Sequence, residues 1–468
     1  MARFLIVNTN REHGPFPIPP IGACQVAGYA ASAGHEIDFL DLCFEGDPES
    51  ALLGRLRAHP PDLIGLSIRN IDNSNMAHTR FYLPFVRGLV DAVRTVSQAP
   101  IIAGGAAVSV APRPVMEYVG ADFAVSGEGE LAVAGLLSGC SPADIPGLLW
   151  RALGDEPVTQ NAGTSRPVPP ETRERMWRWV DTDRYFRRNA PLPFQSKRGC
   201  VFRCVYCTYT NVEGTSYRLK GAKEAAAELA ANTRATGARR VELVDATFNV
   251  PETFALDLCE AILESQDLSG ITFTTSGFNP SVHSPELFGL MERIGFTSVV
   301  CTPESASDTV LHSMRKGFTT YHLARTIEER RRRRIPFLWV FLLGGPGETE
   351  LTVEETFRFI AANVPAEDGV FLTTGVRVYP GTELAEISGD TGDLIEPRFY
   401  ISPSVDPTWL AGRVRDEMRR HTNYVTISDT QNRLLPALNR LLGALRSHLP
   451  LWRFAPAVNR VRNLRSQL

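Results

Sequence analysis

Short apolar runs alternate with helix-length segments along the first 140 residues of the chain. The runs, several of them rich in Ile and Val, lie at Phe4–Val7, Glu36–Leu40, Leu63–Ser67, Ile101–Ala103 and Phe123–Val125. Strands that are apolar on both faces are typical of a buried parallel sheet, and their alternation with helices is typical of a doubly wound α/β fold. We therefore expect residues 1–140 to form a Rossmann-like domain.

The ligand site of such a domain is expected where its strands end. Ligands of doubly wound sheets bind beyond the carboxyl ends of the strands. In this chain those ends carry Asn8–Gly14, Ser67–Asn73, Gly104–Gly105 and Ser126–Glu130. These four segments are the candidate ligand-binding loops of the first domain.

A second alternation of strands and helices begins near Gln195. It follows residues 141–194, where prolines among polar residues predict a linker or a wrapping segment. The expected strands are the segment before Cys200 and the runs Arg240–Leu243, Thr272–Thr275, Ser298–Thr302, Phe337–Leu342 and Phe371–Val378. Because six strands fall short of the eight of a closed TIM barrel, residues 195–400 predict a partial (β/α)6 TIM-like barrel.

The last part of the chain, residues 401–468, differs in composition. Residues 408–468 hold eleven Arg, no Lys and three acidic residues, whereas the whole chain has a formal net charge of −3. Leucines recur at helical spacing over residues 434–445. We expect a basic helical region that packs on the two domains. Contact with an anionic substrate or a membrane surface is the alternative.

The composition of the 468 residues is that of a globular protein, 43% hydrophobic and 22% charged. It excludes a disordered chain and a disulfide scaffold, and the near-neutral charge argues against a surface devoted to nucleic acid or anionic membrane. The chain opens without a charged and apolar leader and has no run near the ~18 apolar residues that span a bilayer. We expect a soluble cytoplasmic monomer that binds no nucleic acid, with Arg330–Arg334 as a solvated helix end.

The eight cysteines fall into two groups. Five are scattered, which is typical of small buried side chains in a reducing compartment. Cys200, Cys204 and Cys207 form a CxxxCxxC cluster on one loop, directly after an expected strand. A structural zinc site needs four protein ligands, and no second cysteine pair lies nearby. A cubane iron–sulfur cluster held by three cysteines leaves one iron free, so the triplet favours such a cluster.

The cysteine spacing, with Tyr206 directly before the last cysteine, resembles the motif of the radical S-adenosylmethionine (SAM) superfamily. Four later segments are similar to that superfamily's strand motifs and come in the same order: Val241–Asn249, Pro303–Lys316, Gly344–Thr349 and Tyr379–Thr382. The resemblance implies that the three cysteines bind a 4Fe–4S cluster whose open iron chelates SAM. It also implies an electron donor of the flavodoxin or ferredoxin type.

The same resemblance suggests how the barrel would hold SAM. Tyr206 would lie against the adenine, and the backbone near Asp245 would meet the methionine amino group. Glu304 would accept a ribose hydroxyl, with Ser276 as a second polar candidate. For Asp245 and Glu304 the alternative is a helix-capping or surface acid.

The first domain resembles the flavodoxin-like domain of cobalamin-binding radical SAM enzymes. The resemblance rests on Gly104 and Gly105 after the fourth strand and on the run Ala121–Glu130, which contains Gly127 and Glu128. Glycines at a strand end let the backbone approach a flat ligand. The resemblance therefore implies that these loops take the nucleotide tail of cobalamin.

The loop of Ser67, Ile68, Arg69 and Asn70 is similar to the part that lies under the corrin in this subgroup. Many cobalamin proteins supply an axial histidine from a DxHxxG pattern, but His13 lacks both the aspartate and the glycine of that pattern. We expect no axial histidine from this loop. Arg69 would then face the cobalt without ligating it. Its alternative partners are a phosphate of the tail and Asp72.

The resemblance as a whole implies a cobalamin-dependent radical SAM methyltransferase. Such an enzyme transfers a methyl group from SAM via methylcobalamin to an unactivated carbon of a small-molecule or natural-product substrate, using a 5′-deoxyadenosyl radical. Rearrangement, ring contraction or cyclisation without methyl transfer is the alternative with the same cofactors. In a second alternative, the first domain is a vestigial interaction module and the basic tail recruits a carrier or a membrane. Sulfur insertion into RNA is disfavoured, because only Cys24 and Cys43 lie near the amino terminus.

Overall fold

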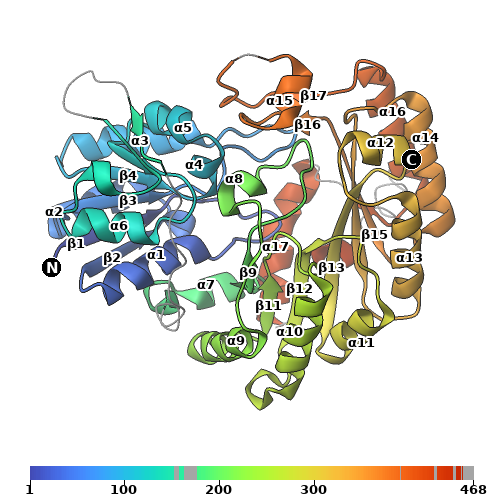
Figure 1. The fold of residues 1–468 in the computed structure, drawn as a ribbon, viewed down its shortest axis with the longest axis horizontal. Coiled ribbons are helices and arrows are strands. Elements are labelled where there is room, and N and C mark those ends of the chain that lie inside the picture. The colour runs from blue at the N-terminus through green and yellow to red at the C-terminus, as the bar shows by residue number, and fades with distance from the viewer. Residues whose placement is uncertain are drawn as a thin grey trace.

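The computed structural model describes residues 1–151, 158–162, 176–390, 392–425, 429–445, 450–454 and 456. Two seven-stranded sheets form the body of the molecule. Figure 1 shows them next to each other, the first in blue and cyan and the second in green to orange. The expected pair of α/β units is therefore confirmed.

The first sheet has the strand order β2-β1-β3-β4-β5-β6-β7, and its first five strands are parallel. This is the flavodoxin-like order, with its ligand edge at the carboxyl ends of β1, β3, β4 and β5. β1 and β3 are buried along nearly their whole length, as their apolar runs predict. The strands are β1 (Arg3–Asn8), β2 (Glu36–Asp41), β3 (Leu63–Ser67), β4 (Ile101–Gly104), β5 (Phe123–Val125), β6 (Leu148–Trp150) and β7 (Thr159–Gln160).

Helices cover both faces of the first sheet. Small buried side chains of α1 pack with α6 on one face, and larger apolar side chains of α2, α3 and α5 form the core of the other. The short helix α4 follows directly on β4 and the Gly104–Gly105 pair. The helices are α1 (Ile21–Ser32), α2 (Pro48–Ala58), α3 (Leu83–Arg94), α4 (Ala106–Val110), α5 (Pro112–Val119) and α6 (Glu130–Leu137).

The segment expected to be a linker, residues 141–194, is partly built into the domains. β6 and β7 pair antiparallel at the edge of the first sheet, because Leu148 and Leu149 are apolar and fully buried there. Farther along, Tyr185 of α7 (Thr182–Phe186) donates a hydrogen bond to Asp41 of β2 at 2.7 Å. Four of its eight prolines, Pro157, Pro167, Pro169 and Pro170, lie outside the described residues.

The second sheet is parallel throughout, in the order β18-β15-β14-β13-β12-β11-β8. Six of its strands, β8 and β11 to β15, are the six expected, and β18 adds a short edge strand. The expected run Phe371–Val378 is broken at Gly375, so that its end forms β16 and pairs with β17. The strands are β8 (Leu192–Phe194), β11 (Arg240–Leu243), β12 (Thr272–Phe278), β13 (Phe296–Glu304), β14 (Phe337–Leu343), β15 (Gly369–Thr374), β16 (Val376–Arg377), β17 (Phe399–Tyr400) and β18 (Tyr424–Val425).

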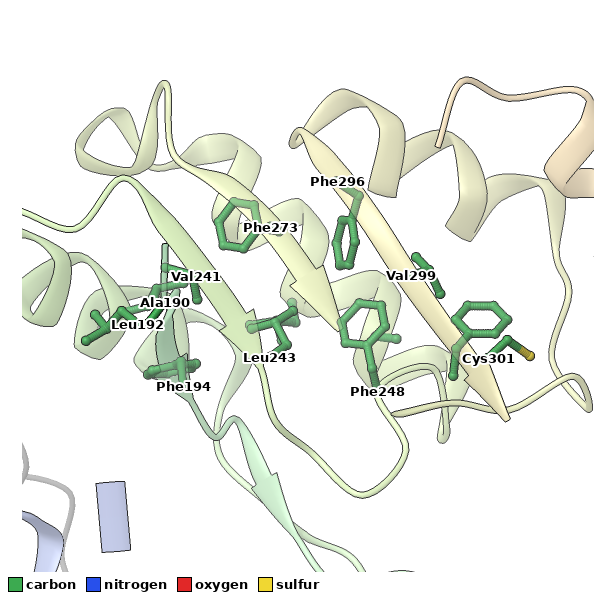
Figure 2. Close-up of a cluster of buried hydrophobic side chains, with 14 of the residues drawn as sticks. Ala190, Leu192, Phe194, Val241, Leu243, Phe248, Phe273, Phe296, Val299 and Cys301 are labelled. Atoms are coloured by element: carbon green, nitrogen blue, oxygen red, sulfur yellow. The ribbon is translucent and has the colours of Figure 1, made fainter. Parts of the chain in front are cut away.

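The outer face of this sheet packs against helices and gives the partial barrel its core. Figure 2 shows apolar side chains such as Leu243 and Phe273 gathered in this core beside Phe248. The barrel helices are α9 (Ala222–Thr236), α10 (Glu252–Glu264), α11 (Pro285–Arg293), α12 (Asp308–Ser313), α13 (Thr320–Arg331) and α14 (Glu350–Asn363). The expected partial TIM-like barrel is confirmed.

The arginine run at the end of α13 is more than a solvated helix end. Arg330 is buried and forms an ion pair with Asp368 at 2.6 Å. Arg332 pairs with Glu328 and Glu329, both at 2.5 Å. The expectation was wrong for Arg330, because Asp368 before β15 lies within reach of the helix end.

The basic carboxyl-terminal region packs on both units, as expected. Asn439 of α17 (Asp429–Ala444) donates a hydrogen bond to the carbonyl oxygen of Pro15 in the first domain. The indole of Trp452 lies 3.4 Å from the hydroxyl of Ser298, near the start of β13. Residues 446–449 and 457–468 lie outside the described part. Over the described residues, we find no helix with the length and apolar character needed to cross a membrane.

Candidate cofactor and active site

A cavity of about 300 Å³ lies at the carboxyl ends of the first sheet. This volume is at the lower end of the range for small-ligand pockets. Six of the residues expected to bind cobalamin line it: Ser67, Arg69, Gly104, Gly105, Gly127 and Glu128. Ile68 does not, because its side chain is buried in the core beneath. The structure thus brings together loops that are far apart in the sequence.

Gly105 is required by the shape of this cavity wall. Its φ is +100°, and a Cβ there would lie 2.6 Å from the carbonyl oxygen of Ile68. A side chain would therefore push the β3 and β4 loops apart. The bare backbone of Gly105 leaves the wall open to a flat ligand.

The barrel supplies the opposite wall of the same cavity. Gln195, Arg198, Val212, Glu213 and Val244 line it together with the loops of the first domain. In Figure 1, helix α8 (Tyr209–Glu213) lies where the two units meet, and it packs against α4. The cavity is therefore shared by the two domains.

Glu128 joins the domains through ion pairs. Arg198 donates to Glu128 at 2.7 Å and to Glu130 at 3.1 Å, and Arg218 also contacts Glu128. Burial lowers the pKa of Arg198, but the carboxylates of Glu130 and Glu128 outweigh it and leave the pKa raised. The Glu128 carboxylate therefore lines the cavity with its charge already paired.

Arg69 extends into the cavity from the loop after β3. Asp72, one of its expected partners, is instead bound by the buried Arg377 at 2.7 Å. No carboxylate lies within 4 Å of Arg69 in the described part of the chain. Burial among protein groups lowers the pKa of the Arg69 guanidinium. Asp72 is therefore excluded as its partner, and Arg69 stays available to a ligand.

The three clustered cysteines lie on the loop between β9 (Lys197–Arg198) and α8. Gly199 starts this loop with a φ of +92°, where a Cβ would meet the carbonyl oxygen of Ser216. Burial raises the pKa of Cys207 to about 12, with smaller contributions from Cys204 and Cys200, while Lys316 opposes the rise. The three thiols thus lie close enough to influence one another.

The donor set fits an iron–sulfur cluster, because thiolates are the ligands that hold such clusters. Among the described residues, no three His, Cys, Asp or Glu side chains already have the geometry of a metal site. The assignment of Cys200, Cys204 and Cys207 as ligands therefore stays a prediction from their spacing and their shared loop.

Glu304 ends β13 beside this loop. It is buried, and its φ of +68° is unusual for a residue with a side chain. Its Oε1 accepts hydrogen bonds from the hydroxyl of Tyr206 at 2.5 Å and from Lys316 Nζ at 3.2 Å. Its Oε2 is buried without a partner. A ribose hydroxyl is the kind of donor that this oxygen lacks.

Asp245 follows β11 and has its carboxylate fully engaged. It accepts from the backbone N–H of Ser196 at 2.8 Å, the Ser196 hydroxyl at 2.5 Å and the N–H of Lys197 at 3.1 Å. The Lys197 ammonium group lies 3.5 Å away. Asp245 therefore anchors the start of the cysteine loop, and only its backbone is free to meet SAM.

Ser276 lies on β12 and donates its hydroxyl to Glu242 of β11. The side chain expected to contact SAM is thus held by a neighbouring strand. Glu242, Lys316 and Arg377 were all missed by the sequence reasoning. Each has a signal there, since Glu242 and Arg377 are single charges between apolar strand residues and Lys316 ends a motif segment.

Two family models match the chain. Residues 9–137 match the B12 binding domain, and residues 195–360 match the radical SAM superfamily. The chain is a B12-binding radical SAM protein. Its cavity lies at the loops of the first match, and its cysteine loop lies within the second.

Curated relatives of this B12-binding radical SAM protein include two enzymes of different activity. The tryptophan 2-C-methyltransferase of Streptomyces laurentii is 24% identical over 414 residues, which cover 75% of this chain and 68% of that enzyme. The anaerobic magnesium-protoporphyrin IX monomethyl ester cyclase of Synechocystis sp. is 24% identical over 311 residues, which cover 65% and 60%.

Solved structures share the whole architecture. The radical SAM methyltransferase TsrM from Kitasatospora setae, with cobalamin and a [4Fe-4S] cluster bound, matches with a TM-score of 0.83 at 22% identity and full coverage of both chains. The cobalamin-dependent radical SAM enzyme OxsB matches with a TM-score of 0.68 at 13% identity, over 95% of this chain and 72% of that one. At these identities the likeness establishes the fold.

Proposed function

We propose that this chain is a cobalamin-dependent radical SAM methyltransferase that modifies a carbon of a small-molecule substrate. The bound cofactors would supply methyl transfer from SAM via methylcobalamin and a 5′-deoxyadenosyl radical for an unactivated carbon. The protein's own contribution is to hold the cofactors and substrate in line and to exclude water.

The observation that carries this proposal is the cavity shared by the two domains. Gly104 and Gly105 form its wall on one side, and Val212 and Glu213 of α8 form it on the other. The same helix follows directly on the cysteine loop. A cofactor in the cavity and a cluster on the loop would therefore both lie next to one short helix.

The residues would divide the work as follows. Cys200, Cys204 and Cys207 would hold the 4Fe–4S cluster, and the open Oε2 of Glu304 would accept a ribose hydroxyl of SAM. Tyr206 would lie near the adenine with its hydroxyl held by Glu304. Gly105 and Gly127 would leave room for the cobalamin tail, and Arg69 would face the lower side of the corrin.

The substrate and the other partners follow from the same proposal. Kitasatospora setae TsrM has been solved with tryptophan as its substrate, so tryptophan is the first compound to assay. We also propose an electron donor of the flavodoxin or ferredoxin type, a monomeric state and a cytoplasmic location. All eight cysteines are free, which supports a reducing compartment.

The test uses SAM with an isotopically labelled methyl group. The reconstituted protein is incubated with tryptophan, a reductant and labelled SAM, and the product is analysed by mass spectrometry. Methyl label in the product is the expected result. A modified product without label would replace methylation by rearrangement or cyclisation, the type of activity that the Synechocystis relative represents.

A further inference from the structure

Glu242 lies in the middle of β11 and points away from the barrel's outer core. Its neighbours Val241 and Leu243 are fully buried, and Figure 2 shows both in the cluster of the outer core. Successive side chains of a strand point to opposite faces. Glu242 therefore points into the interior of the partial barrel.

The interior face of the barrel is open. Along β12, β13 and β14, residues that point inward are partly exposed, whereas their neighbours on the strand are buried. Glu242 pairs in register with Thr274 of β12, and Ser276 follows on the same face of that strand. Val300 and Val340 are partly exposed on β13 and β14. The interior thus has a polar side and an apolar side.

The carboxylate of Glu242 has little compensation from the protein. It accepts one hydrogen bond, from the hydroxyl of Ser276. Over the described residues, no Lys, Arg or His nitrogen lies within 4 Å of it. Burial raises the pKa of Glu242, although Ser276, Arg69 and Arg240 oppose the rise. Glu242 is partly exposed toward the barrel interior and accepts one hydrogen bond, so its remaining acceptor positions face the place where a donor or cation on the ligand would bind.

We propose that Glu242, supported by Ser276, is the group that selects the substrate. It would bind a protonated amine or another N–H donor of a small molecule whose apolar body lies toward Val300 and Val340. This inference rests on the proposed function, because it takes the barrel interior as the substrate's place. It adds a substrate class, nitrogen-bearing amphipathic compounds, and names the residue that recognises them.

The test measures binding without turnover. Equilibrium dialysis with the reconstituted protein compares two matched pairs of probes, tryptamine with indole-3-propionate and phenethylamine with 3-phenylpropionate. We expect the wild type to bind at least one amine ten times more tightly than its matched carboxylate. We expect Glu242→Gln to lose that preference. Glu260→Gln, which changes an exposed carboxylate on α10, should keep it.

Several results would overturn the assignment. The first is an absence of amine preference in the wild type. The second is amine binding by Glu242→Gln that is as tight as that of the wild type. The third is a Glu242→Gln variant that loses SAM binding while it keeps amine binding. The last result would place Glu242 at the cofactor. The wild type by itself must show the amine preference, so the proposal can be refuted even if the variant does not fold.

Failure of this inference can be separated from failure of the proposed function. An amine preference that depends on Glu242 in a protein that transfers no methyl label would keep the binding site and refute the methyltransferase. Methyl transfer by a protein without amine preference would keep the methyltransferase and refute Glu242 as the selecting residue.

Discussion

Two acidic residues three positions apart, Glu242 and Asp245, have opposite surroundings. Asp245 accepts from two backbone N–H groups and a hydroxyl and lies beside the Lys197 ammonium group. Glu242 accepts from a single hydroxyl. Both lie on or just after one strand, and the sequence draws no distinction between them. Asp245 is thus bound by Ser196 and Lys197 at the start of the cysteine loop, whereas Glu242 keeps the acceptor positions that the proposed ligand would use.

The same contrast appears between Glu128 and Glu304. Glu128 lines the cavity, but Arg198 and Arg218 bind its carboxylate. Glu304 is paired through Oε1, and its Oε2 has no partner. A carboxylate near a cofactor cavity is therefore a candidate to bind the cofactor only through an oxygen atom that has no hydrogen-bond partner in the protein.

The largest effect is expected for the cysteine loop. Asp245 accepts hydrogen bonds from Ser196 and Lys197 just before this loop, and Glu128 binds Arg198 there. Cys204→Ala should abolish cluster binding and turnover together, because three thiolates are the full ligand set. Iron content and 5′-deoxyadenosine formation measure this. Cys259→Ala, a packing cysteine of α10, should keep the cluster. Retained deoxyadenosine production by Cys204→Ala would refute the cluster assignment.

Asp245→Ala tests the acid whose carboxylate is fully bound by other groups of the protein. It leaves the Lys197 ammonium group buried without its carboxylate, so we expect a loss of about 3–5 kcal/mol in the free energy of unfolding. Denaturant unfolding of the apoprotein measures the loss. The exposed Asp257→Ala on α10 should change stability little. Equal stability of the two variants would contradict a structural role for Asp245.

Glu348 shows what happens to an open carboxylate that has no cation near it. Its Oε2 accepts from the N–H groups of Gly344 and Gly345, Oε1 has no partner, and burial raises its pKa from 4.5 to about 7. The folded state then binds the proton more tightly than the unfolded chain. The stability this contributes is full below pH 4.5 and is lost as the pH rises to about 7.

Glu348→Gln carries no titrating group and should therefore gain stability relative to the wild type as the pH rises. Between pH 5 and pH 8 we expect the difference in free energy of unfolding to grow by about 2 kcal/mol. Denaturant unfolding at the two pH values measures it. A difference that is independent of pH would mean that Glu348 stays ionised in the fold.

Glu304→Gln keeps the size of the side chain and one acceptor oxygen, so its effect on activity should be the smallest. If the open Oε2 accepts a ribose hydroxyl, the KM for SAM should rise about tenfold. Because the variant also removes the carboxylate that pairs with the buried Lys316, we expect a loss of stability as for Asp245→Ala. Glu286→Gln on α11 is an exposed control. An unchanged KM would remove Glu304 from the SAM site.

The sequence predicted the elements well where the pattern is long and regular. All five parallel strands of the first sheet and six strands of the second lie where their apolar runs are. The short edge strands β6, β7 and β18 were missed, because two or three residues carry no period. Gly375 breaks a run that looked continuous, since its φ of +75° turns the chain toward β17.

The sequence predicted the loops of the site and the types of side chain on them, but it did not predict which side chains bind each other. Asp245 binds residues 48 and 49 positions away, Glu128 binds an arginine 90 positions away, and Arg377 binds an aspartate 305 positions away. Such partners are decided by the fold and leave no local pattern. This is why Asp72 was a reasonable partner for Arg69 in the sequence and is excluded in the structure.

We propose that one cavity between the domains brings cobalamin next to the SAM cluster. A crystal structure of the reconstituted protein with cobalamin and SAM tests it most directly. We expect corrin density at the loops of Gly105 and Gly127, a cluster on Cys200, Cys204 and Cys207, and the SAM ribose at Glu304. Cobalamin bound elsewhere, or a cluster held by other residues, would contradict it.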